Sequence, residues 1–129
     1  MDTSRRFRPH HRMKSGAQFS RAYSRGARAR GPILQVVLFE HGEAHTRLGL
    51  SVGKRIWKSA VKRNRVRRIF REAFRLEYPS LPPGCDLVLI PSAPSLDPDI
   101  EETRKELVRL AKKAHVKSAR KKATDEEKP

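Results

Sequence analysis

Residues 59–78 read SAVKRNRVRRIFREAFRLEY, and this stretch has the strongest structural pattern in the sequence. At about 100° per residue, its apolar residues fall on one arc of a helix. The opposite arc carries Asn64, Arg68, Arg71 and Arg75, flanked by Arg65 and Arg67. Ser59 is a suitable N-cap, and Pro79 ends the pattern. The stretch predicts an amphipathic helix with one arginine-rich face and one packing face, the latter made of Val66, Ile69, Phe70, Ala73 and Glu77.

Basic charge is concentrated in this helix and at the N-terminus. The 129 residues include 30 Lys and Arg against 14 Asp and Glu, a formal net charge of +16. Residues 54–75 carry ten basic side chains and residues 1–31 carry nine, with a single acid in each range. Clustered arginine favours a polyanionic partner, because the guanidinium group binds phosphate with two hydrogen bonds. The composition therefore predicts a nucleic-acid-binding protein.

The sequence lacks the features of a secreted mini-protein and of an integral membrane protein. It has no apolar stretch long enough to cross a membrane and no secretory signal, and its single cysteine, Cys85, rules out an internal disulfide framework. The length fits one domain. We expect a cytoplasmic protein with no membrane association.

The elements around the arginine-rich helix are predicted from apolar patterning and turn residues. Residues 33–40 and 47–52 predict a β-hairpin, residues 85–90 an interior strand, and residues 27–32 a loop. Residues 15–24 predict a short helix capped by Ser15, and a last helix is expected from Asp97 to Ala114. Gly49, inside a strand, indicates close approach by another backbone or a bulge.

Together these elements predict an α+β fold, a two-layer sandwich with the helices on one face of a mixed sheet. Three segments are expected along the chain. They are a basic N-terminal arm over residues 1–14, a single folded domain over 15–115, and a disordered tail over 116–129.

The residues that usually carry catalysis give no pattern here. None of the five histidines has the spacing of a zinc ligand, Cys85 begins a buried strand, and the acids of residues 97–106 are interpreted as a solvated helix face. No glycine-rich phosphate loop is present. The sequence predicts no catalytic residue and no metal site in the protein.

The segment Lys62–Arg68, KRNRVRR, resembles the RNR motif of the bacterial ribonuclease P protein subunit. RLGLSV at residues 47–52 resembles the strand that leads into that motif, and Phe19, Tyr23 and Gly26 are similar to the family's first helix. The resemblance extends from about Arg12 to Ala114, which is most of the chain.

This resemblance implies a sandwich like the second domain of ribosomal protein S5, with a left-handed βαβ crossover through the RNR helix. It implies partnership with a catalytic RNA that removes the 5′ leader from precursor tRNA, using Mg²⁺ held mainly by the RNA. The protein would then be an accessory subunit of an endoribonuclease, and no obligate protein partner is expected.

The resemblance also implies which residues bind RNA. The leader would lie in a cleft between the first helix and the sheet, lined by Phe19, Tyr23 and Val37, where the family often carries an aromatic residue at the Val37 position. Arg21 and Arg25 flank this cleft in the sequence. The contacts to RNA implied around the motif are Lys54, Arg55, Lys62, Arg63, Asn64, Arg65, Arg67 and Arg68.

Two other functions fit the same composition. A ribosomal or general RNA-binding protein would share the basic helix and take no part in cleavage. A stand-alone nuclease would need clustered acids to hold metal ions, which the basic regions lack. The first alternative differs from a ribonuclease P subunit in one measurable respect, because its affinity for a tRNA leader would not depend on the catalytic RNA.

Overall fold

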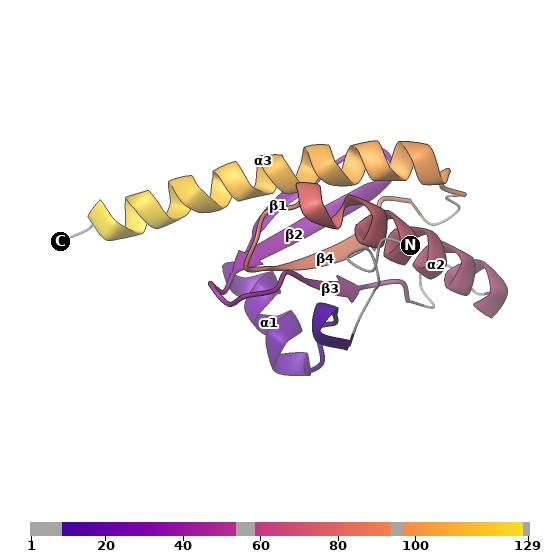
Figure 1. Ribbon diagram of the computed structural model, residues 1–129, viewed down its shortest axis with the longest axis horizontal. Helices are drawn as coiled ribbons and strands as arrows, with labels where there is room; N and C mark the ends of the chain where they lie inside the picture. The colour runs from indigo at the N-terminus through magenta and orange to yellow at the C-terminus, as the bar shows by residue number, and fades with distance from the viewer. Residues whose placement is uncertain (1–8, 54–58, 94–96, 128–129) are drawn as a thin grey trace.

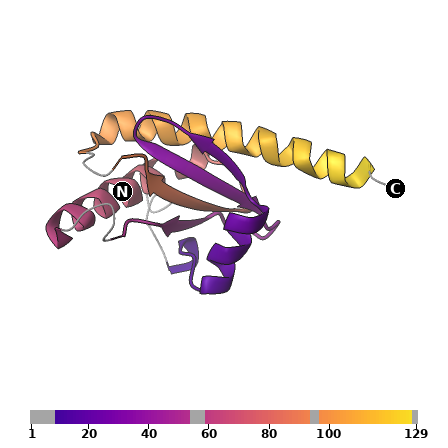
Figure 2. The same ribbon diagram turned by 180° about the vertical axis from the view of Figure 1, so that it is seen from behind.

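The computed structural model describes residues 9–53, 59–93 and 97–127. It has a four-stranded sheet with helices packed on both faces (Figures 1 and 2). The elements in chain order are η2 Pro9–His11, α1 Gly16–Arg25, β1 Ala27–Arg30, β2 Leu34–Glu40, β3 Arg47–Leu50, α2 Ala60–Glu77, η3 Tyr78–Ser80, β4 Cys85–Pro91 and α3 Ile100–Glu127.

The strand order β1-β2-β4-β3 confirms a mixed sheet but makes the predicted hairpin wrong. Strand β4 lies between β2 and β3, antiparallel to the first and parallel to the second. All of β4 except Ile90 is buried, as expected for a continuous apolar strand at the centre of a sheet. The four-residue strand β3 lies at one edge of the sheet, where Arg12 forms an isolated parallel bridge with Leu48.

The loop predicted over residues 27–32 is also wrong, because Ala27–Arg30 forms the other edge strand, β1. Its small alanines are buried and its arginines are exposed in strict alternation. Alternation with a period of two is the signature of a half-buried strand. Short side chains made this signal weak in the sequence.

Helices cover both faces of the sheet rather than one. Helices α2 and α3 pack on the face that presents Leu38 of β2 and Leu87 of β4, in a core that includes Phe70 and Leu107. Helix α1 lies on the opposite side of the sheet from α3 in both views (Figures 1 and 2), where its Ala22 packs in one cluster with Val37. The two-layer arrangement is therefore corrected to one with a third, partial layer.

The helix starts follow their caps. Ser15 and Gln18 form a full capping box at α1, and the Ser59 hydroxyl accepts a hydrogen bond from Lys62 N at α2. Helix α3 begins at Ile100 rather than at Asp97, and the carboxylate of Asp99 accepts from Glu102 N. These caps fix the residue at which each helix begins.

Helix α3 continues to Glu127, through most of the segment for which the sequence predicts disorder. The segment lacks a large apolar residue after Val116 but is rich in lysine and alanine, which favour helix. Lys117 Nζ also donates to the Arg28 carbonyl at 2.9 Å and ties this part of α3 to β1. In Figure 1 the helix extends past the end of the sheet.

Glu106 is a buried acid on α3 and not part of a solvated face. Its Oε2 accepts hydrogen bonds from the backbone N–H groups of Ile33 and Leu34, at 2.8 and 2.7 Å. This carboxylate therefore joins α3 to the turn that enters β2.

In the part of the chain that the structure describes, no helix is long and apolar enough to cross a bilayer.

Candidate nucleic-acid interface

Helix α2 presents the predicted basic residues on the side that faces away from the core. Val66, Phe70, Ala73 and Phe74 are buried, whereas the side chains of the motif lie at or near the surface. Lys62, Asn64, Arg65 and Arg68 are exposed, and Arg63 and Arg67 are half-buried. Lys54 and Arg55 lie outside the described residues.

The motif residues do not all play the same part. Arg67 Nη2 donates to the Val52 carbonyl at 2.9 Å, and its Nη1 donates to Asn64 Oδ1 at 3.3 Å. Arg67 therefore holds the chain that leaves β3 against α2. Arg65 Nη2 lies 3.3 Å from Asp97 Oδ1 in an exposed ion pair, which contributes little to stability.

Glu72 is the one acid within the basic stretch of residues 54–75, and it is paired with Arg75. The hydrogen bond from Arg75 lowers the pKa of the Glu72 carboxyl below its ordinary value, against a smaller opposing effect of burial. This pair therefore takes one arginine out of the charge available to a partner.

A groove of about 230 Å³ lies between α2, β3 and α1. Phe19 of the predicted leader cleft and Arg67 of the arginine motif both line this groove. The groove therefore joins two sites that are predicted separately from the sequence. The other lining residues are Arg12, Met13, Leu48, Gly49, Leu50 and Arg71. Neither Arg12 nor Arg71 is among the predicted contacts, although Arg71 lies one helical turn after Arg67.

Gly49 is the residue that lets α1 approach β3. A β-carbon at this position would lie 2.7 Å from Met13 Sδ and 2.8 Å from the Phe19 ring. The close approach predicted for Gly49 is present, but it is made by side chains and not by a backbone. Glycine here keeps Phe19 at the floor of the groove.

The predicted cleft residues lie together, but they differ in exposure. Phe19 and Tyr23 are half-buried and pack against a small cluster on the α1 face of the sheet that contains Val37 and Val88. Val37 has no exposed surface, so it supports α1 from below and offers nothing to a ligand. Phe39, two residues later on the same face of β2, is the half-buried aromatic residue at this site.

Arg28 of β1 lies beside Tyr23, one of the predicted cleft residues. Its guanidinium is 5.5 Å from the centre of the Tyr23 ring, and its Nη2 donates to the Tyr23 carbonyl at 3.4 Å. The side chain is exposed, so it adds positive charge next to an aromatic face. Single-stranded nucleic acid is bound by such combinations of aromatic platforms and cations.

A buried carboxylate, Asp86 of β4, holds α1 on the sheet. Arg47 Nε donates to Asp86 Oδ1 at 2.6 Å, and Arg21 Nη2 donates to Asp86 Oδ2 at 3.4 Å. The Arg21 guanidinium also lies 4.6 Å from the centre of the Phe39 ring. Arg21 is therefore engaged in the structure of the cleft, and of the two arginines that flank the cleft in the sequence, Arg25 is the exposed one.

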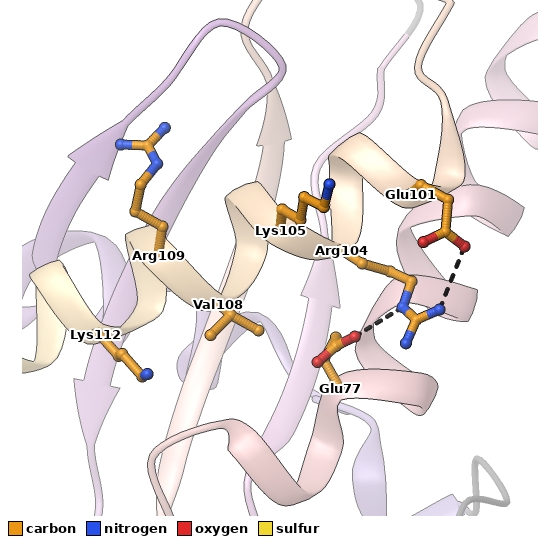
Figure 3. A pocket seen from close by; sticks show the side chains of 7 residues that line it. All are labelled: Glu77, Glu101, Arg104, Lys105, Val108, Arg109 and Lys112. Carbon is orange, nitrogen blue, oxygen red and sulfur yellow. Dashed lines mark hydrogen bonds and ion pairs between the residues drawn. The ribbon is translucent and has the colours of Figure 1, made fainter.

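A larger hollow of about 600 Å³ lies beside α3 and the end of α2 (Figure 3). Arg104 is directed at Glu77 and Glu101, with Nε 2.7 Å from Glu77 Oε1. The hydrogen bond to Glu77 raises the pKa of the Arg104 guanidinium. None of the predicted site residues lines this hollow, where the Arg104–Glu77 ion pair joins α3 to α2.

Among the described residues, the one group of three or more potential ligands is His10, His11 and His45. Imidazole nitrogens are poor ligands for Mg²⁺, which prefers oxygen. The prediction of no metal site rested on spacing along the chain, which does not detect this spatial group.

Comparison with known proteins identifies what this arrangement resembles. Residues 7–115 match the sequence model of the Ribonuclease P family, a range that includes both α2 and the α1 cleft. The chain is 39% identical over 106 residues to the ribonuclease P protein component of Shouchella clausii, covering 81% of this chain and 86% of that protein. It is 34% identical to the corresponding protein of Picosynechococcus sp. over 82% of this chain and 91% of that protein.

Solved structures give the same result for the fold. The RNase P protein of Staphylococcus aureus matches with a TM-score of 0.69 and 28% identity, over 81% of this chain and 94% of that chain. The RNase P protein of Thermotoga maritima matches with a TM-score of 0.69 and 26% identity, over 79% of this chain and 96% of that chain.

Proposed function

Since the chain belongs to the bacterial ribonuclease P protein family and is a component of that holoenzyme, we propose that it binds the catalytic RNA and the 5′ leader of precursor tRNA. In this role it assists Mg²⁺-dependent removal of the leader and is itself not the catalyst. Lys54, Arg55, Lys62, Arg63, Asn64, Arg65, Arg67 and Arg68 are the proposed RNA-binding residues.

The observation that carries this proposal is the groove in which the arginine helix meets the aromatic cleft. Arg67 and Arg71 form one wall, Phe19 lies in it, and Met13 and Gly49 complete it. A strand of nucleic acid that lies in this groove meets cations along its phosphates and an aromatic ring at its bases. The exposed outer arc of α2 stays available for a second RNA.

A division of roles between the RNA and the protein explains how a protein with no predicted catalytic residues assists hydrolysis. Two-metal cleavage of a phosphodiester needs oxygen ligands that hold divalent ions, and RNA phosphates supply them. The protein contributes positive charge that lets two polyanions approach each other, with release of their counterions. Contact with the leader adds affinity for precursor tRNA that mature tRNA does not have.

The finer fold assignment belongs to the same proposal. We infer a left-handed β3–α2–β4 crossover and a likeness to the second domain of ribosomal protein S5. The adjacent, parallel strands β3 and β4 are joined through α2 and so form a βαβ unit, while its left hand and the ribosomal likeness are what membership of the family implies. Superposition of an experimental structure on that ribosomal domain tests both points.

We expect Arg68→Ala to weaken binding to the catalytic RNA without lowering the melting temperature. Arg68 is exposed and lies off the buried seam, so its loss removes charge and no packing. The plot of log affinity against log salt concentration has a negative slope. This slope should become less steep by about one unit for each phosphate group that the variant no longer neutralises. Fluorescence titration of the protein with the RNA over a range of salt concentrations measures both quantities.

Lys105→Ala is the matched control for this variant, because it removes one exposed positive charge from α3, away from the proposed interface. It should leave the affinity and the slope near those of the wild type. Equal losses for the two variants would mean that net charge alone drives binding, and no loss for Arg68→Ala would remove this residue from the interface.

A further inference from the structure

Three histidines that are distant in the sequence meet at one end of the sheet. His10 and His11 belong to η2, and His45 precedes β3. One ring nitrogen from each can be chosen so that all three lie within 4.8 Å of one another. The His10 ring centre is 4.2 Å from that of His11 and 4.2 Å from that of His45.

The nitrogens lie within 4.8 Å of one another, a limit wider than the spacing of ligands on a bound metal ion. Ligands at about 2.0–2.1 Å from a tetrahedral zinc ion lie about 3.4 Å apart. His10 and His45 are exposed, so small rotations of their side chains bring the nitrogens closer without disturbing the core. His11 is buried beside Tyr78, with ring centres 4.7 Å apart, and provides the fixed member of the group.

Charged side chains surround the histidine group. Arg12, Lys14 and Arg47 line the same pocket of about 350 Å³ as His10 and His45. Glu43 also lines the pocket and places one carboxylate next to the group.

We propose that His10, His11 and His45 bind one divalent transition-metal ion of the zinc class. Three imidazole donors select zinc, copper, nickel or cobalt over Mg²⁺ and Ca²⁺, which prefer oxygen. Three protein ligands leave the fourth tetrahedral position to water or to an anionic oxygen. This site is separate from any Mg²⁺ that the RNA holds.

Such an ion would connect the N-terminal segment to the chain that enters β3. Immediately after His11, Arg12 bridges Leu48 of β3, and Met13 N donates to the Leu48 carbonyl at 3.0 Å. Met13 and Arg12 both line the groove beside Phe19. Metal binding therefore holds one wall of the groove in place.

The test is calorimetric titration of the chelator-treated, full-length protein with ZnCl₂, in excess MgCl₂ and without RNA. The wild type should bind one equivalent of zinc that Mg²⁺ does not displace. His45→Gln and His10→Gln should each weaken binding by about ten-fold or more, since removal of even an outer-shell partner of a metal costs that much. The matched control is His115→Gln, which replaces a half-buried histidine of α3 outside the group and should bind zinc like the wild type.

A second readout separates a built site from loose surface binding. Cobalt in a tetrahedral site with three imidazole ligands gives visible absorption that His45→Gln should abolish, and zinc should raise the melting temperature of the wild type but not of that variant. The proposal is overturned if zinc does not bind in excess Mg²⁺. It is equally overturned if His10→Gln and His45→Gln bind zinc as tightly as His115→Gln does.

Discussion

Asp86→Ala is expected to lower the free energy of unfolding by about 3 kcal/mol, at the low end of the range for breaking a buried ion pair. Asp86 has no exposed surface and accepts hydrogen bonds from Arg47 and Arg21. Its removal leaves the Arg47 guanidinium, whose side chain is 16% exposed, without its main partner. For a domain of this size the melting temperature should fall by about 10 °C, measured by circular dichroism.

The matched control is Asp97→Ala, which removes an exposed carboxylate that also pairs with an arginine. Exposed pairs are worth about 0–1 kcal/mol, so this variant should melt within a few degrees of the wild type. If Asp86→Ala and Asp97→Ala were equally stable, the buried network would not be what holds α1 on the sheet.

Tyr23→Ala is expected to weaken binding of precursor tRNA to the reconstituted holoenzyme about five- to a hundred-fold. Stacking of a base on an aromatic ring is worth about 1–3 kcal/mol by alanine substitution. Tyr23 is half-buried, with one side on the sheet cluster and Arg28 beside its ring. Binding of mature tRNA, which has no leader, should change little.

Tyr23→Phe controls for the ring itself, since it keeps the stacking surface and should bind precursor tRNA nearly as tightly as the wild type. The melting temperature of each free variant is measured alongside. Equal losses for precursor and mature tRNA in Tyr23→Ala, together with a lower melting temperature, would show that Tyr23 is a packing residue and not a leader contact.

Much of the fold could be predicted from local patterns, because those patterns have local causes. The amphipathic stretch at α2 and the caps Ser15 and Ser59 each depend on residues within one or two turns. Strand pairing depends on contacts between segments that are far apart in the sequence. The sequence therefore indicates that β2, β3 and β4 exist, but not that β4 lies between the other two.

The same distinction applies to the site. The basic face of α2 could be predicted because its period is visible along one helix. The groove could not, because Phe19 and Arg67 come together only through the packing of α1 on β3 at Gly49. The sequence places Asp86 in an interior strand and Glu106 on a solvated helix face, but it does not show which groups either carboxylate binds, because those partners are distant along the chain.

The proposed role is tested most directly by cleavage of precursor tRNA at limiting Mg²⁺, with the protein alone, the catalytic RNA alone, and the two together. We expect no cleavage by the protein alone, and faster, site-specific leader removal by the RNA when the protein is present. The increase in cleavage rate should be smaller for a precursor whose leader is too short to reach the groove between α2, β3 and α1. Site-specific cleavage by the protein alone that survives nuclease controls, or a cleavage rate of the RNA that the protein leaves unchanged, would contradict the account.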